Sequence, residues 1–295
     1  MKPQFDNKVM SSFLLWFDHT LLNDGEAFTK HSGKFYEVDS LYNGLYTYGA
    51  PFKQFVQDFS ITGASIPTGI YLDSVFITPG QSNLTGINYE QGHVYFTSEI
   101  TSPSTRLSGN YSIKDFNVYL TNEAEEKLLF ETKFSLRPRT TQTETGLDPN
   151  QITYPAIFLR NDGGTNEPMA FGGYDNTTIN IRAVVLADSQ YLLDAAASIF
   201  RDKARTFVTM LETTDMPFNS LGGFKNSVRY NYTGIIAGKT SENQYVFIEN
   251  VTVSKFSRDV NLKIDNLNPD IFNGVIDFEI SKPRYPRRAY LGEDL

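Results

Sequence analysis

Cysteine is absent from the 295 residues of the chain. Its absence excludes disulfides, thiolate nucleophiles and cysteine-ligated zinc or iron–sulfur centres. Histidine is scarce as well: His19, His31 and His93 are at no spacing that would place two metal ligands on one helix turn. We expect His93, which adjoins a turn, to be a partly exposed strand residue, and we expect no metal and no cofactor.

The sequence motifs of common catalytic sites are also missing. There is no Gly-x-Ser-x-Gly elbow for a serine nucleophile and no Gly-x-x-x-x-Gly-Lys-Ser/Thr loop for phosphate. The carboxylates Glu123, Glu125 and Glu126 are typical of a solvated loop, and Asp162 with Glu167 could bind calcium, although the twelve-residue ligand pattern is absent. We predict that the chain is not an enzyme; a glycan hydrolase is the alternative, because it needs only two carboxylates.

Charge is sparse and mostly negative. Charged residues make up 20% of the chain, with a net charge of −8 and a pI of about 5.0. An acidic chain binds nucleic-acid phosphates poorly, but it can form a wall past which DNA slides without sticking. No apolar run approaches the length of a membrane span, and the run Phe13–Phe17 is too short for a signal peptide. We therefore expect no membrane among the partners.

Apolar residues are plentiful, at 40% of the chain with 23 Phe and 17 Tyr, and can fill a sizeable core. Helical spacing predicts an N-terminal helix from Asn7 to Asn23, stopped by Gly25, within a helical segment of residues 1–27. Such a helix either packs on its own domain or docks on a neighbour. Short alternating runs then predict a β-sandwich or barrel-like domain over residues 28–136. Its predicted strands are Lys34–Val38, Gly44–Tyr48, Gln54–Phe59, Ile70–Ile77, Gly86–Tyr89, His93–Ser98, Asn110–Thr121 and Lys127–Phe134.

The second half of the chain predicts an α+β domain over residues 156–282, with one main helix on a mixed sheet. It follows a linker or long loop, residues 137–155, which has almost no apolar residues. Asp188 or Ser189 is expected to cap the helix. A polar loop is predicted at Asn161–Glu167, and strands at Ala156–Arg160, Thr177–Leu186, Thr206–Leu211, Ser227–Ile236, Tyr245–Phe256 and Gly274–Ile280. Residues 283–295 form an extended C-terminal arm, or a frayed terminus.

The stretch LTGINYEQGHVYFTSEI, from Leu84 to Ile100, predicts two strands joined by a tight turn. Together with LSGNYSIKDFNVYL it resembles β-modules of tailed-bacteriophage virion proteins. The resemblance is carried by Ile87, Tyr89, Gly92, Val94, Phe96, Gly109 and Tyr111. YNGLYTYGAPFKQFV (Tyr42–Val56) and the stretch from Asn166 to Asp202 look similar to structural proteins of marine and freshwater phages. The strand–helix–sheet order after Thr177 is similar to tail-terminator and other head–tail neck proteins, although many terminators are shorter.

The resemblance implies a structural virion protein that packs as an oligomeric ring around a DNA channel. The implied partners are further copies of the chain and other virion proteins, such as portal or adaptor, tail tube or sheath, with DNA passing nearby unbound. The implied location is the virion, assembled in the host cytoplasm. The N-terminal helix and the C-terminal arm would reach a neighbour through Phe13, Trp16, Phe17, Arg284, Tyr285, Arg287, Arg288 and Tyr290. The alternative is a carbohydrate-binding β-sandwich of a phage baseplate or a cell surface, because exposed aromatic residues on a β face would suit sugars.

Overall fold

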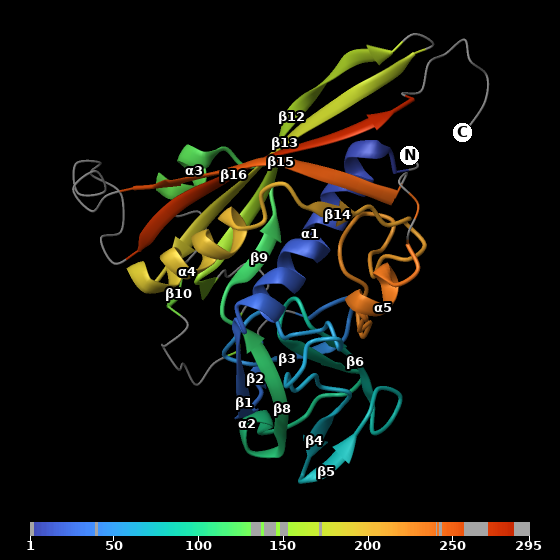
Figure 1. Ribbon diagram of the computed structural model, residues 1–295. Coiled ribbons are helices and arrows are strands. Elements are labelled where there is room, and N and C mark those ends of the chain that lie inside the picture. Colours follow the sequence, from blue (N-terminus) through green and yellow to red (C-terminus); the bar gives the residue numbers. More distant parts are fainter. Residues whose placement is uncertain are drawn as a thin grey trace.

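The computed structural model has an α+β fold rich in strands, with an N-terminal helix, smaller sheets and a large sheet curled into a half-barrel (Figure 1). The predicted fold class is thereby confirmed. The structure describes residues 3–38, 41–130, 137–138, 146–147, 153–170, 173–239, 241, 244–256 and 271–285.

Helix α1 (Phe5–Asp24) runs through the centre of the molecule, with the large sheet on one side and the small sheets at its lower end (Figure 1). The Asn7 side chain accepts the backbone N–H of Gln4 at 3.0 Å at its start. At its end the Gly25 N–H donates to the Leu21 carbonyl at 3.1 Å, as the sequence predicts. Because neighbouring elements enclose the helix, its middle is buried around nearly the whole circumference, from Ser12 to Asp18.

The large sheet has six strands, and all neighbours are antiparallel except β9 and β12. Helix α4 (Gln190–Arg201) packs beside α1 on one face, and Ser189 caps α4 by accepting the Leu192 N–H, as predicted. The two helices and this face form the main core. The strand order is β14 (Phe207–Thr209), β15 (Tyr245–Lys255), β16 (Phe272–Arg284), β13 (Tyr174–Ala187), β12 (Ala156–Ala170) and β9 (Asn117–Leu120).

Two four-stranded sheets from the first half of the chain enclose a second core, centred on Phe35, Phe55 and Tyr111. One has the order β1 (Phe28–Lys34), β8 (Leu107–Lys114), β4 (Ile70–Leu72) and β5 (Val75–Ile77), and the other β2 (Tyr36–Glu37), β3 (Tyr46–Gly49), β7 (His93–Phe96) and β6 (Leu84–Asn88). The predicted strand Asn110–Thr121 is divided between β8 and β9, which belong to different sheets. The chain thus crosses from the small sheets to the large sheet at this point.

The hairpin predicted in LTGINYEQGHVYFTSEI is present as β6 and β7. Ile87, Val94 and Phe96 lie in the second core with at most 1% of their surface exposed, as their alternation predicts. Gly92 in the turn has φ +66°, and a Cβ there would lie 2.2 Å from the Phe52 carbonyl oxygen. No other residue fits this position, because both the backbone conformation and the close approach require glycine.

Several sequence predictions of local structure were wrong. The predicted strand Lys127–Phe134 begins in helix α3 (Glu125–Phe130), and its last four residues lie outside the described residues. The predicted strand Ser227–Ile236 contains helix α5 (Tyr232–Ile236). The Asn231 side chain caps α5 by accepting the Gly234 N–H at 2.8 Å, and this local bond favours a helix over the β-branched propensity of the segment.

Two other segments differ because pairing partners distant in sequence decide their structure. Gln54–Phe59 forms two isolated bridges, Phe55 to Ile113 and Asp58 to Tyr230, rather than a strand. The polar segment Asn161–Glu167 is part of β12 and pairs along β13 instead of forming a loop. Its side chains are exposed on both faces, so it shows no apolar alternation.

The predicted linker, residues 137–155, is described only at a few positions. Strand β10 (Arg137–Pro138) pairs in parallel with β11 (Thr153–Tyr154). Leu147 is buried, and its carbonyl contacts His93 of the small sheets.

The short helix α2 (Pro103–Arg106) precedes β8. Of the predicted arm, residues 286–295 lie outside the described residues, whereas Pro283 and Arg284 extend β16.

Candidate functional site

The described part of the chain leaves one face of the large sheet largely uncovered. Helices α1 and α4 cover the opposite face, and α3 with the β11 segment covers only the end of this face that carries Phe158, Val184 and Leu186. The remainder opens into two adjoining hollows of about 340 and 560 Å³. We call it the polar face. Its lining residues are Asp162, Thr165, Glu167, Asn176, Thr178, Asn180, Arg182, Glu249, Asn250, Thr252, Asp277, Glu279 and Ser281. Ile181 and Phe278 also border the hollows, but their side chains are buried in the main core.

The alternation of side chains along β13 and β16 produces the polar face. On β13, Ile179 and Ile181 are buried in the main core, while Asn180 between them is exposed. The register places Asn180 opposite Glu279, so polar side chains from neighbouring strands lie side by side. Each strand therefore contributes apolar side chains to the helices and polar side chains to the open side.

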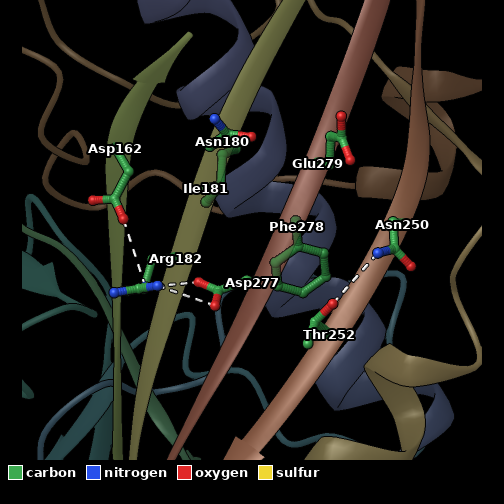
Figure 2. Close-up of a pocket in the computed structure, with 9 residues that line it drawn as sticks. All are labelled: Asp162, Asn180, Ile181, Arg182, Asn250, Thr252, Asp277, Phe278 and Glu279. Atoms are coloured by element: carbon green, nitrogen blue, oxygen red, sulfur yellow. Dashed lines mark hydrogen bonds and ion pairs between the residues drawn. The ribbon is translucent and has the colours of Figure 1, made fainter.

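Arg182 organises the end of the polar face nearest α3, as Figure 2 shows. Its guanidinium donates to both carboxylate oxygens of Asp277, at 2.7 and 3.1 Å, and to Glu125 at 2.9 Å. Asp162 lies 3.5 Å away on its other side and also pairs with Arg160. The bond to Asp277 raises the pKa of Arg182 further above its ordinary value, so this cation is permanent.

Negative charge prevails on the rest of the polar face. The lining residues include five carboxylates and a single arginine, and that arginine pairs with two of the five. Within the described part of the chain, the side chains of Glu167 and Glu279 form no hydrogen bond or ion pair, and neither does the side chain of Asn180. Polar groups without partners cost little here, because they are exposed to water. The face thus presents acidic and amide groups that are available for contacts outside the chain.

An aromatic groove of about 460 Å³ continues from the polar face at the opposite end from Arg182. The Phe207 ring is 64% exposed, with its centroid 5.0 Å from Phe247 and 5.9 Å from Tyr245. Tyr174 lies on the other side, and the exposed ring of Tyr285 packs on it at 4.8 Å. The lining residues are Tyr174, Phe207, Tyr245, Phe247, Ser281, Lys282 and Pro283. Exposed aromatic rings gathered in one groove mark an interaction site.

The structure brings the histidines to separate places. His19 Nδ1 lies 2.7 Å from the buried carboxylate of Asp58, which also accepts the hydroxyl of Ser60. This is a buried junction between α1 and the small sheets, and Ser60 bonds the carboxylate rather than the imidazole, so the arrangement differs from a nucleophile–base pair. His93 is 1% exposed, so its prediction as partly exposed was wrong. Its Nε2 lies 2.6 Å from the Leu147 carbonyl, a partner that sequence spacing could not reveal.

Metal-binding geometry is absent from the described residues: no group of three or more His, Cys, Asp or Glu side chains could hold an ion. The calcium alternative for Asp162 and Glu167 is weakened further because Asp162 is engaged by Arg160 and Arg182. No helix in the described part of the chain combines the length and apolar character needed to cross a membrane.

The interface residues predicted on α1 are committed to the main core. Phe13 and Phe17 are 0% exposed and Trp16 is 8% exposed, so these rings stabilise the chain itself and are not available to a neighbour. Phe17 stacks on Phe200 at 3.8 Å, which shows that the helix packs on its own domain. The strongly apolar sequence of the helix fits both interpretations, and only the sheet that it meets decides between them.

The C-terminal interface residues are divided. Arg284 donates to the Thr177 hydroxyl at 2.8 Å and lies over the Phe5 ring, so it is engaged within the chain. Tyr285 is 59% exposed, as an interface residue would be. Arg287, Arg288 and Tyr290 lie outside the described residues. The polar face and the aromatic groove were missed by the sequence analysis, because their residues come from strands that meet only in the folded sheet.

No protein-family model matches the chain, and no curated protein matches it significantly in sequence.

Proposed function

We propose that the chain is a structural subunit of a tailed-phage virion, forming an oligomeric ring in the head–tail neck with the polar face lining the DNA channel. One observation carries the proposal: the large curled sheet has one face packed against helices and one face open, polar and acidic. A curved sheet with helices on one side suits the wall of a channel, with the helices outside. Heterologous contacts between identical subunits would close such a ring.

The charge of the polar face supports this placement. Excess carboxylates repel the phosphates of DNA, so the double helix would pass the wall without being held. A binding surface for DNA would instead carry lysine and arginine, and the single arginine of this face is neutralised by Asp277 and Asp162. The resemblance of the sequence to neck proteins implies the same arrangement, with further copies of the chain and other virion proteins as partners.

Electron microscopy and charge reversal test the proposal together. The purified chain should form rings or add to portal or tail-tube assemblies in negative stain. The variant Glu167→Lys/Glu249→Lys/Glu279→Lys should retain DNA in a salt-dependent manner, whereas the unchanged ring should not. The control reverses three exposed carboxylates remote from the polar face, Glu26→Lys/Glu37→Lys/Glu99→Lys, with the same change in net charge.

Two outcomes would overturn the proposal. A stable monomer that joins no neck component would contradict the ring. Equal DNA retention by the control and by the polar-face variant would contradict the channel lining, because net charge alone would then explain binding.

A carbohydrate-binding protein is the second candidate, favoured by the aromatic groove with free amide and carboxylate groups beside it. Sugar rings stack on aromatic faces while their hydroxyls bond neighbouring polar groups. Binding to a glycan array that is lost on Phe207→Ala would support this candidate, and a flat array together with ring formation would exclude it.

A further inference from the structure

We propose that the aromatic groove binds the C-terminal segment, residues 286–295, of a second copy of this chain. The inference rests on the proposed function, because it requires a homo-oligomer. It identifies the contact that joins one subunit to the next. Its basis is the shape of the groove, the charge beside it and the position at which β16 ends.

The groove has the dimensions of a site for an extended peptide. Its two aromatic walls come from β15 with β14 on one side and from β13 on the other, and β16 between them forms the floor through Ser281 and Pro283. Walls two strands apart are separated by about 10 Å, the width that one extended chain occupies. Phe207 can serve as the anchor contact, because its ring is exposed and supported from below by Phe247.

The carboxylates beside the groove favour an occupant that places cationic side chains next to them. Glu249, Glu167 and Glu279 line the adjoining hollow, and the last two have no partner in the described part of the chain. Residues 286–295 read PRRAYLGEDL, with Arg287 and Arg288 three and two residues before Tyr290 and with Glu293 and Asp294 near the end. Arginine forks pair well with carboxylates, and a tyrosine ring fits an aromatic groove, so the segment matches both parts of the site. A neutral glycan would hydrogen-bond these carboxylates without neutralising their charge.

A second copy, rather than the same chain, is the source of the segment. Strand β16 forms the floor of the groove and continues outward to Arg284, with Tyr285 held against Tyr174. The next residue is Pro286, which disfavours the helical conformation for Tyr285 and so favours continuation of β16 through that residue. To bring Arg287 to the carboxylates beside its own groove, the segment would need to reverse within two residues of Tyr285, whereas a neighbour can be reached without a reversal.

Cross-linking between full-length chains tests the inference. Because the chain has no native cysteine, only the introduced cysteines can form disulfides. Chains carrying only Thr178→Cys are mixed with chains carrying only Ala289→Cys and oxidised mildly. Thr178 lines the polar face beside the groove, so heterodimers should appear on a non-reducing gel. The control mixture replaces Thr178→Cys by Phe76→Cys, a 47% exposed position on β5 that should give background cross-linking. Adding Phe207→Ala to the Thr178→Cys chain should lower the yield about tenfold, as loss of an anchor does.

Each alternative occupant has its own outcome. A chain that carries both Thr178→Cys and Ala289→Cys tests whether the groove binds the segment of the same chain. If only the disulfide within one chain forms, the groove binds its own segment and the inference is overturned. Binding of a glycan from a panel at Phe207, with no interchain cross-link, would assign the groove to carbohydrate. Rings in negative stain without the cross-link would refute this contact and leave the proposed function standing. An interchain cross-link between chains that never form rings would support this contact and contradict the proposed ring.

Discussion

The two faces of the large sheet are built by the same strands and have opposite chemistry. On the covered face, Phe278 packs among Phe13, Phe17 and Phe200 with ring centroids 5.0 to 6.1 Å apart. On the open face, the next residue of the same strand, Glu279, is exposed and unpartnered in the described part of the chain. Burial of aromatic area explains the stability of the first face, but no contact among the described residues explains the acidic composition of the second.

Polar groups in the interior differ from those of the open face in the same way. The Lys114 ammonium lies 2.7 Å from the Asp18 carboxylate, and both side chains are at most 5% exposed. His93 is likewise buried with the Leu147 carbonyl as its partner. The buried side chains of Lys114, Asp18 and His93 thus have partners within the chain, whereas on the polar face the side chains of Glu167, Asn180 and Glu279 have none in the described part of the chain. Changes inside should alter stability, and changes on the polar face should alter assembly.

The largest expected effect comes from truncating the covered face. Phe17→Ala removes a ring that is 0% exposed and stacked on Phe200, and should lower the free energy of unfolding by about 4 kcal/mol. Urea denaturation followed by circular dichroism measures this loss. The matched change on the open side is Phe207→Ala, which should leave the denaturation midpoint nearly unchanged. A similar loss for both variants would remove the distinction between the faces.

Breaking the buried ion pair should have the next largest effect. Lys114→Met leaves the Asp18 carboxylate buried without its cation and should cost about 3 kcal/mol of unfolding free energy. The control is Arg106→Met, which removes the partner of Asp73 in a pair that is exposed to solvent. That variant should unfold at the same urea concentration as the unchanged chain. Equal destabilisation by the two changes would show that burial does not set the strength of these pairs.

His93 should make the interior sensitive to acid. Burial, with the nearby Lys53 ammonium, lowers the pKa of His93 to about 4 from the usual 6.5. Between these values the unfolded chain binds a proton that the folded chain does not. The stability contribution is therefore complete above pH 6.5 and is lost as the pH falls toward 4, by about 2 kcal/mol at pH 4.5. Urea titrations at pH 7 and 4.5 should show this extra loss in the unchanged chain relative to His93→Gln. Identical pH dependence in both chains would refute it.

Local signals in the sequence predicted the elements whose determinants are local. The glycine stop of α1, the Ser189 cap of α4 and the turn at Gly92 are each decided within a few residues. The strand Thr177–Leu186 was also predicted, because its β-branched residues fill the main core. Segment 161–167 was predicted as a loop because it becomes a strand only through its pairing with β13.

The candidate site could not be predicted for the same reason. Asn180, Glu279 and Asn250 lie on three strands that are adjacent only after the chain has folded. Each looks in the sequence like an ordinary exposed strand residue. The alternation of Asn176, Thr178, Asn180 and Arg182 on β13 was visible, but a polar side of one strand does not reveal whether a helix covers it.

Neutralising a carboxylate of the polar face should have the smallest effect on stability. Glu279→Gln removes a charge that has no partner in the described part of the chain, and should change the free energy of unfolding by less than about 0.5 kcal/mol. The sign should be slightly stabilising, because Asp277 and Glu279 are two positions apart on the same face of β16 and repel each other. Urea denaturation at low and high salt measures both features, since screening should remove the gain. A loss above 1 kcal/mol would mean that Glu279 stabilises the subunit itself, and the polar face could not then be a surface reserved for contacts outside the chain.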